Sequence, residues 1–312
     1  MELIRGLHNL KDRHRGCAVS IGNFDGVHLG HKAVLDQLAV QARRLEVPAL
    51  VMLFEPQPAE YFAPERAPVR LTRLREKLRA LDGDAVDQVL CVRFDAAFSH
   101  ITADSFVRDI LHRRLGARHV LVGDDFRFGK GRAGDLAFLS GLAPELGFTV
   151  GCRDTFEVDG ERVSSTRVRA ALQAGDLELA RRLLGYDYNL YGRVAHGDKR
   201  GRTIGFPTAN VHLHRLKVPV SGVFAVRLHC NGAAPLLGVA NLGHRPTVRG
   251  NEPVPLLEVH LLDYDGDLYG RHVRVDFLKH LRDERRFESF DALKAQIEDD
   301  VTAARRYFAT SP

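Results

Sequence analysis

Hydrophobic residues follow a regular alternation in the first half of the chain. Short, continuous apolar runs are typical of buried strands, and the longer segments between them repeat apolar residues every three or four positions, as amphipathic helices do. Strands that alternate with helices predict a parallel sheet with ligands beyond the carboxyl ends of its strands. The predicted strands are 17–21, 49–54, 88–92 and 119–122, and the predicted helices are 31–45, 71–81, 102–115 and 177–184.

The pattern changes near residue 185 to short alternating strands separated by glycine and proline turns. This spacing predicts an antiparallel barrel. Its expected strands are 190–195, 222–230, 236–241, 256–262 and 272–278, and a helix follows at 289–307. A length of 312 residues also favours two domains. We therefore predict an α/β domain with a Rossmann-like parallel sheet over residues 1–184, and a mainly β barrel with a C-terminal helix over residues 185–312.

The turn between the first predicted strand and helix, SIGNFDGVHLGH, carries the strongest chemical signal. Its glycines let the backbone approach a ligand, and the start of the following helix favours an anion. His28 and His31 flank this helix start and can donate hydrogen bonds to a phosphoryl group that gains negative charge. The turn therefore predicts nucleotidyl transfer. Two alternatives are a plain connector and a metal site formed by the histidines with Asp25.

Two later segments also follow predicted strands of the first half. In GDDFRFGKG, Phe126 and Phe128 can stack on a planar ring or serve as core residues beneath the loop, and Asp125 can bind a polar group. In VSSTRVRAAL, the hydroxyl residues can cap a helix, and Arg169 can reach a phosphate held at the N-terminus of that helix. Both segments therefore predict ligand contacts.

The predicted barrel begins with a glycine-rich basic loop, GRVAHGDKRGRTIGFPTAN. Its backbone amides and cations such as Lys199 can wrap a polyphosphate, and Thr208 and Asn210 offer the oxygen ligands that Mg²⁺ accepts. An ordinary basic hairpin loop is the alternative. Glu258 interrupts the apolar strand LLEVHLLD, where a carboxylate can act as general base for an alcohol or simply face solvent.

Composition is ordinary for a soluble globular protein, with 45% hydrophobic and 27% charged residues. The formal net charge is only +5, and the pI is about 9.1, which favours anionic small molecules over a nucleic-acid surface. The N-terminal segment is too polar for a secretory signal, and no apolar run is long enough to span a bilayer. Four widely separated cysteines, most of them in apolar strand-like runs, are typical of reduced, buried thiols. We expect a cytoplasmic protein without membrane partners.

Six motifs together resemble those of bacterial bifunctional riboflavin kinase/FAD synthetases. In chain order they are GNFDGVHLGH, GDDFRFGKG, VSSTRVR, HGDKRGRTIGFPTAN, GVANLGHRPT and LEVHLLDYDGDLYG, and they span nearly the whole chain. The resemblance implies an FMN adenylyltransferase domain of the nucleotidyltransferase type, followed by a riboflavin kinase barrel. In that family, the kinase transfers the ATP γ-phosphate to riboflavin. FMN then attacks the α-phosphate of a second ATP, which yields FAD and pyrophosphate, and both steps use Mg²⁺.

The resemblance also implies roles for individual residues. His28 and His31 would stabilise charge on the ATP phosphates, and Glu258 would be the catalytic base of the kinase. The implied flavin contacts are Phe126, Phe128 and Arg282, the metal ligands are Thr208 and Asn210, and the nucleotide or phosphate contacts are Gly22, Asn23, Phe24, Asp25, Gly30, Asp125, Ser164, Thr166, Arg169, Gly197, Lys199, Gly201, Arg202 and Gly205.

Two positions depart from the family pattern. Gln57 stands where His is commoner in the EP-x-P loop, and His244 stands where Thr is commoner after NLG. Neither carries an implied catalytic role, so the departures concern substrate contacts.

Two other functions compete with flavin nucleotide synthesis. One is adenylyl transfer to another acceptor, such as a pantetheine or nicotinamide mononucleotide. The other is RNA binding of the class I tRNA synthetase kind, against which the absence of a KMSKS-like loop argues. We expect small-molecule substrates, no nucleic acid, and a monomer or weak homo-oligomer.

Overall fold

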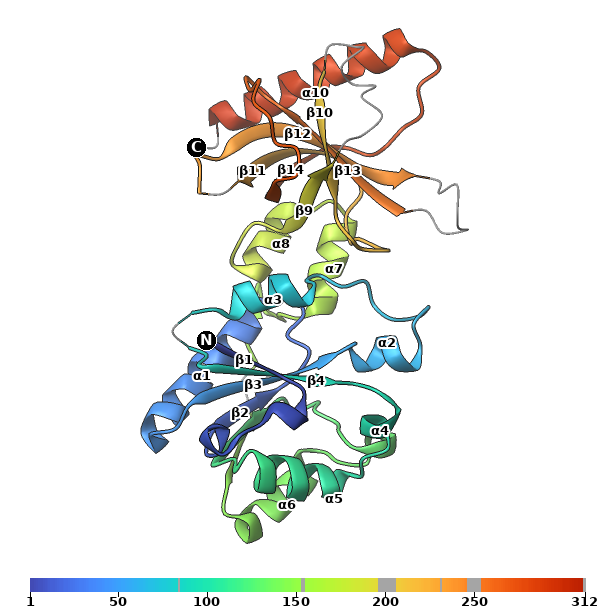
Figure 1. Cartoon of the computed structure of the whole chain (residues 1–312). Helices are drawn as coiled ribbons and strands as arrows, with labels where there is room; N and C mark the ends of the chain where they lie inside the picture. Colours follow the sequence, from blue (N-terminus) through green and yellow to red (C-terminus); the bar gives the residue numbers. More distant parts are fainter. Residues whose placement is uncertain (84, 153–154, 196–205, 231, 246–253, 311–312) are drawn as a thin grey trace. The chain divides into compact units, whose positions relative to one another are not determined.

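The computed structural model describes residues 1–83, 85–152, 155–195, 206–230, 232–245 and 254–310. The chain forms two compact units (Figure 1). Unit 1 contains Met1–Pro68 and Thr72–Ser164, and unit 2 contains Val69–Leu71 and Ser165–Pro312. The two helices before residue 185 therefore group with unit 2, and a boundary between catalytic domains after Leu184 stays a prediction.

Unit 1 is an α/β fold, as predicted. In the part that the structure describes, its parallel strands have the order β1-β4-β3-β2-β5-β6. The strands are β1 (Glu2–Arg5), β2 (Ala18–Ile21), β3 (Ala49–Glu55), β4 (Gln88–Arg93), β5 (His119–Val122) and β6 (Thr149–Cys152), followed by the hairpin β7 (Glu157–Val158) and β8 (Glu161–Arg162). The helices are η1 (Leu7–Asn9), η2 (Asp12–His14), α1 (Leu29–Leu45), α2 (Pro58–Phe62), α3 (Leu74–Leu81), α4 (Ala96–Ser99), α5 (Ala103–Ser105), η3 (Phe106–Arg114), η4 (Lys130–Arg132) and α6 (Leu136–Leu146).

Apolar side chains of the sheet enter two cores, one on each face. Val19 packs in one core with Phe106 of η3 and Leu139 of α6. Its neighbour Ala18 packs in the other core with Leu38 of α1 and Leu81 of α3. Figure 1 shows α6 and α3 on opposite faces of the sheet. Because both faces are covered, the strands read as continuous apolar runs rather than as alternating ones.

Two predicted helices differ from the observed ones. The helix predicted from residue 71 begins at Leu74, because Arg73 is an extended N-cap whose backbone N–H donates to Glu76 Oε2 (2.7 Å). The helix predicted from residue 102 is capped by the Thr102 hydroxyl, but after α5 it continues as the π-helical η3.

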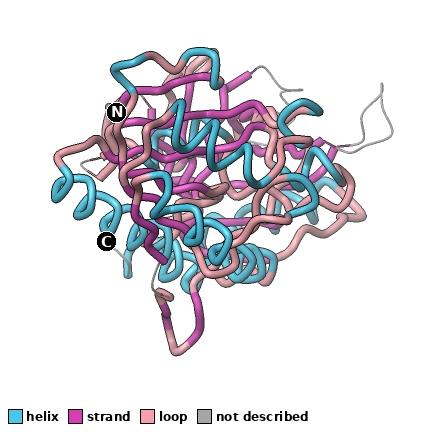
Figure 2. The backbone as a smooth tube through the Cα atoms, turned by 90° about the horizontal axis from the view of Figure 1, so that it is seen from below, coloured by secondary structure: helices cyan, strands magenta, loops and turns pink. Residues whose placement is uncertain are grey.

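Unit 2 contains the predicted antiparallel barrel. Its described strands close in the order β10-β13-β12-β11-β14-β9. Figure 2 distinguishes strands, in magenta, from helices, in cyan. The elements are α7 (Ser165–Gln173), α8 (Leu177–Leu184), β9 (Asn189–Ala195), β10 (Thr208–His212), β11 (Gly222–Cys230), β12 (Leu236–Arg245), β13 (Val254–Leu261), β14 (His272–Arg282) and α10 (Phe290–Thr310). The strand β10 was not predicted, because its residues TANVH close the basic loop and are too few for a clear pattern.

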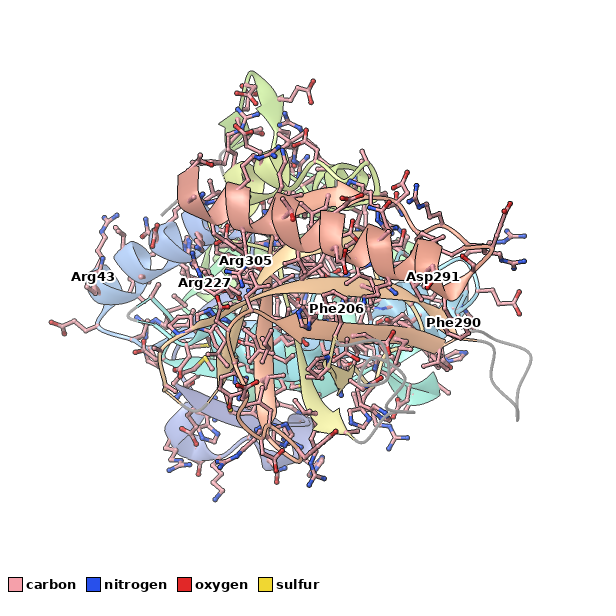
Figure 3. All side chains as sticks on the ribbon, turned by 90° about the horizontal axis from the view of Figure 1, so that it is seen from above. Arg43, Phe206, Arg227, Phe290, Asp291 and Arg305 are labelled. Atoms are coloured by element: carbon pink, nitrogen blue, oxygen red, sulfur yellow. The ribbon has the colours of Figure 1, made fainter. Side chains whose placement is uncertain are left out.

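The long helix α10 packs on the outside of the barrel. Its Ala304 shares a core with Val223 and Ala225 of β11 and with Val239 of β12. Figure 3 shows α10 lying across the strands, with Phe290 and Asp291 at one end and Arg305 toward the other. The guanidinium of Arg305 forms two hydrogen bonds to Asp263 (2.7 and 2.9 Å). The outer face of β11 and β12 is therefore covered by a helix.

A short segment of the N-terminal half is built into unit 2. Arg169 Nε donates to the carbonyl oxygen of Val69 (2.6 Å), and Arg215 Nη1 donates to that of Arg70 (3.1 Å). The Tyr188 hydroxyl donates to the carbonyl oxygen of Leu71 (3.3 Å). These bonds to successive carbonyl groups explain why residues 69–71 group with the barrel.

The cysteines only partly match the expectation of buried thiols. Cys17 is buried, and burial raises the pKa of its thiol to about 12. Cys91 and Cys230 are half-buried and Cys152 is exposed. Cys152 and Cys230 are the last residues of β6 and β11, where the end of a strand leaves them accessible. The expectation therefore holds fully only for Cys17. None of the described helices combines the length and the apolar character needed to cross a membrane.

Candidate active sites

The turn after β2 lies where the strand order of the sheet reverses. From β2 the chain builds β3 and β4 on one side and later returns to add β5 and β6 on the other. Open α/β sheets bind ligands at this position, beyond the carboxyl ends of the strands. His28 is the N-cap of α1, so the predicted strand–turn–helix is confirmed.

His28 and His31 lie side by side at the start of α1. Their rings stack with centroids 3.7 Å apart and planes at 20°. His28 is buried, and its Nδ1 accepts a hydrogen bond from the backbone N–H of His31 (3.3 Å). The ring of Phe24 lies 4.9 Å from that of His31. Both imidazoles are therefore fixed at a helix N-terminus, where the helix dipole already favours an anion.

Gly30 brings the VSST segment beside this helix start. A Cβ atom at Gly30 would lie 3.2 Å from His28 Nδ1 and 3.3 Å from the carbonyl oxygen of Val163. The close approach explains the residue type, because any side chain would press on both neighbours. The first motif is thus adjacent to Val163, which begins the third motif, and Ser164, the last residue of unit 1, follows directly.

A cavity of about 730 Å³ opens at the same end of the sheet. Polar groups of Ser20, Asn23 and His31 line it, as does Gly22. Besides Phe24 of the turn, its aromatic wall consists of phenylalanines from β3, α2, the segment after β4, α4, η3 and the GDDFRFGKG loop: Phe54, Phe62, Phe94, Phe98, Phe106, Phe126 and Phe128. A cavity lined by polar groups and by many aromatic rings suits a ligand that joins an anionic group to a planar ring.

Most of this aromatic wall was missed in the sequence. The positions of two phenylalanines could have indicated the wall, because Phe54 lies near the end of one predicted strand and Phe94 lies just after another. The carboxyl ends of neighbouring parallel strands meet at one edge. Two phenylalanines at such ends therefore indicate a shared apolar wall.

The GDDFRFGKG loop also lines this cavity. Phe126 and Phe128 stack with centroids 5.3 Å apart, and Phe128 also packs on Phe106 in the core. The rings therefore serve as core residues, as the second alternative predicted, and they also line the cavity. Asp125 also lines the cavity, and its Oδ2 accepts a 3.4 Å hydrogen bond from Arg162 of β8. Their ligand contacts stay predictions.

The remaining predicted site residues of the first and third motifs differ in burial and in hydrogen-bond partners. The Asp25 carboxylate is buried and bonds to Thr72, a residue that sequence reasoning did not select. Thr166 is exposed at the start of α7, and Arg169 donates to the Val69 carbonyl. Phosphate binding by these groups stays a prediction. As for the alternative metal site, no cluster of three His, Cys, Asp or Glu suited to a metal occurs in the described ranges.

A second polar face lies on the barrel. Asn210 of β10 is directly opposite Glu258 of β13, and Thr208 is opposite His260. On the other side of β13, Asn241 of β12 is also opposite Glu258. Directly opposed residues of antiparallel strands share a face, so the predicted metal ligands and the predicted base are neighbours. Asn210, Glu258 and Asn241 thus form a row across three strands. Asn241 was not predicted as a site residue, although the GVANLG motif contains it.

This polar face lies on the outer side of the barrel, the side on which α10 packs against β11 and β12. Val223 of β11 is opposite Asn241 and shares a core with α10. Leu257 and Val259, which flank Glu258 in β13, are fully buried on the inside. The loop residues Gly197, Lys199, Gly201, Arg202 and Gly205 lie outside the described residues.

Arg282 joins this face to α10. It is opposite Val223 in the β11–β14 ladder, and its guanidinium binds the Asp300 carboxylate through Nε (2.9 Å) and Nη2 (2.8 Å). Asp300 is 5% exposed and also accepts from Gln296 Nε2 (2.9 Å). A flavin contact by Arg282 stays a prediction, but its side chain is already oriented at the edge of the polar face.

Replacing Asp300 should destabilise the protein measurably. Asp300→Ala leaves a mostly buried guanidinium without its carboxylate, so we expect the free energy of unfolding to fall by about 3 kcal/mol. The exposed neighbour provides the control, since Asp299→Ala should change it by less than about 0.5 kcal/mol. Urea unfolding followed by circular dichroism measures both, and equal midpoints for the two variants would contradict this role.

The two departures from the family pattern lie in different settings. Gln57 is 7% exposed and forms a reciprocal capping box with Glu60 at the start of α2. His244 pairs with Pro255 through the backbone of β12. Their effect on substrate contacts stays a prediction.

Two family models and the named relatives below indicate one family. The FAD synthetase family model matches residues 10–167, and the riboflavin kinase model matches residues 184–308. A protein of Escherichia coli K12 named bifunctional riboflavin kinase/FMN adenylyltransferase is 54% identical over 309 residues, which cover 99% of this chain and 98% of the relative. One of the same name from Haemophilus influenzae is 48% identical over 308 residues and 99% of each chain. A crystal structure described as a macrolide-efflux protein from Streptococcus pneumoniae superposes with a TM-score of 0.83 at 28% identity, covering 98% of this chain and 99% of that one.

Proposed function

The chain belongs to the bifunctional riboflavin kinase/FMN adenylyltransferase family, and we propose that its two reactions take place at two separate sites. It phosphorylates riboflavin to FMN with ATP, and it adenylylates FMN to FAD with a second ATP. The observation that supports the assignment of sites is the cavity of unit 1, because His31, which stacks on His28 at the start of α1, lines it together with the aromatic wall. The polar outer face of the barrel is then the kinase site.

Adenylyl transfer requires little more of the protein than alignment and charge stabilisation. A phosphate oxygen of FMN attacks the α-phosphorus of ATP, the bond to the bridging oxygen breaks, and pyrophosphate leaves. Negative charge builds up on the phosphates, where His28 and His31 donate hydrogen bonds beside the α1 N-terminus. The aromatic wall holds the isoalloxazine ring by stacking. With both ends of FMN held in one cavity, the attacking oxygen is oriented without a protein nucleophile.

Phosphorylation of riboflavin requires a base for the 5′-hydroxyl group. Glu258 accepts that proton as the hydroxyl oxygen attacks the γ-phosphorus and ADP leaves. The Thr208 hydroxyl and the Asn210 amide oxygen suit Mg²⁺, and their shared face with Glu258 supports this assignment. When bound, Mg²⁺ neutralises charge on the ATP phosphates. The cation-bearing loop before β10 is the proposed partner for those phosphates.

The substrate class, the cellular location and the oligomeric state are also proposals. A modest charge of +5 supports small anionic substrates rather than a nucleic acid. We propose that the protein acts in the cytoplasm on riboflavin, FMN and ATP, as a monomer or weak homo-oligomer.

A single incubation tests both activities. Purified protein with riboflavin, ATP and MgCl₂ should form FMN and then FAD, and chromatography with fluorescence detection follows both products. Omitting MgCl₂ and adding a chelator should abolish both steps, because the phosphate charge is then not neutralised. If riboflavin is unchanged after prolonged incubation, the proposed function is wrong. Formation of FMN without FAD would support the kinase activity and contradict the adenylyltransferase activity.

A further inference from the structure

The turn that carries the histidines is strained. Phe24 has a φ of 46°, Gly26 of 82° and Val27 of 37°. Positive φ suits glycine, but for a β-branched residue such as valine it is unfavourable by about 1 kcal/mol or more. A strained backbone persists only where surrounding structure holds it. Some group outside the turn must therefore stabilise it.

Thr72, which lies far from the turn in the sequence, forms hydrogen bonds that stabilise the turn. Its backbone N–H donates to Asp25 Oδ1 (2.9 Å), and its hydroxyl donates to the same oxygen (3.1 Å). The hydroxyl oxygen in turn accepts from the backbone N–H of Gly26 (2.9 Å). Thr72 is 6% exposed and Asp25 is 2% exposed. Water therefore competes little for these bonds, and the hydroxyl acts both as a donor and as an acceptor.

The bonds act on the part of the turn that orients the histidines. Gly26 and Val27 immediately precede His28, and Phe24 packs on the His31 ring. A shift of the backbone at residues 24–27 would move the N-cap of α1 and the stacked imidazoles with it. Since charge stabilisation depends on distances near 3 Å, a displacement of about 1 Å can lower a rate about 100-fold.

From these contacts we infer that Thr72 is a positioning residue for adenylyl transfer. It acts through Asp25 and Gly26 to keep the strained turn in the conformation that places His28 and His31 against the ATP phosphates. This inference rests on the proposed function of that site. It also gives Asp25 a task distinct from the nucleotide contact predicted from the sequence.

Substitutions of Thr72 in the full-length protein test the inference. Thr72→Val keeps the shape but removes the hydroxyl, so the kcat for FAD formation from FMN should fall about 10- to 100-fold. The KM for ATP should change less than about threefold, because positioning acts in the transition state. Riboflavin phosphorylation serves as the internal control and should keep its rate.

Further variants separate positioning from general stability. Thr72→Ser restores the hydroxyl and should recover most of the rate, and Thr72→Cys should lie between Ser and Val because a thiol is a weak hydrogen-bonding group. Thr149→Val is the matched control, because it removes a hydroxyl that bonds to His119 elsewhere in unit 1 (2.8 Å). Its kcat for FAD formation should be unchanged. If Thr72→Val does not fold, the comparison of Ser with Cys decides the same question.

Several results would overturn the inference. These are an unchanged kcat in Thr72→Val, a Ser variant as slow as Val, or a loss confined to the KM for ATP. Hydrogen exchange in the peptide covering residues 22–31 is independent of activity and should be faster in Thr72→Val than in the unaltered protein. If the unaltered protein forms no FAD, the proposed function is wrong, but the hydrogen-exchange measurement still tests the role of Thr72. An exchange rate that is the same in Thr72→Val and in the unaltered protein would show that Thr72 does not stabilise the turn.

Discussion

Replacing His28 with alanine should reduce FAD formation from FMN and ATP about 100- to 1000-fold, the scale observed when one donor to a developing negative charge is removed. His28 is buried beside His31 at the start of α1, so a replacement by water would not restore the hydrogen bond in the same geometry. Riboflavin phosphorylation should keep its rate within about twofold. With riboflavin as substrate, FMN should accumulate, which chromatography detects directly.

The His28 variants need a control for helix capping, because His28 Nδ1 also caps α1. His28→Asn keeps a capping acceptor without an imidazole, and it should be as slow as His28→Ala. The exposed His8 provides a control for loss of a histidine elsewhere in unit 1, and His8→Ala should be fully active. A fast His28→Asn variant would show that His28 serves only as a cap.

Glu258→Gln should impair the reaction that His28→Ala leaves unaffected. Phosphorylation of riboflavin should fall about 100- to 10,000-fold, because the amide cannot accept the proton of the 5′-hydroxyl group. The substitution keeps the size of the side chain, and therefore its place between Asn210 and Asn241 on the barrel face. FAD formation from supplied FMN should be unaffected. Initial rates with riboflavin and with FMN, measured separately, check both statements.

Two controls sharpen this second prediction. Glu298→Gln changes an exposed carboxylate of α10 and should leave phosphorylation unaltered. An equimolar mixture of the Glu258→Gln and His28→Ala proteins should convert riboflavin to FAD, because FMN made by one is released to the other. If both variants lose the same step, the assignment of one reaction to each unit is wrong.

The chemical candidates could be read from the sequence wherever a motif is local. His28 and His31 were placed at a helix start because a glycine turn, an apolar run before it and helical periodicity after it all lie within one short stretch. Glu258 was noticed because a carboxylate interrupts an apolar strand. These inferences needed only the order of residue types along the backbone.

Contacts between distant segments could not be read in this way. Nothing in the residues around Thr72 indicates that its hydroxyl contacts Gly26, which lies far away in the sequence. The row formed by Asn210, Glu258 and Asn241 depends on the register of three strands, which a shift by one residue would destroy.

The sequence by itself determined the two kinds of fold, the order of most strands and helices, and the residue types suited to phosphate and flavin chemistry. These follow from local periodicity and from the chemistry of single side chains. Tertiary structure alone decided that seven phenylalanines share one wall, that β10 completes the barrel and that Arg282 binds Asp300. It decided these points because packing, strand register and buried hydrogen bonds join residues whose separation along the chain leaves no local pattern.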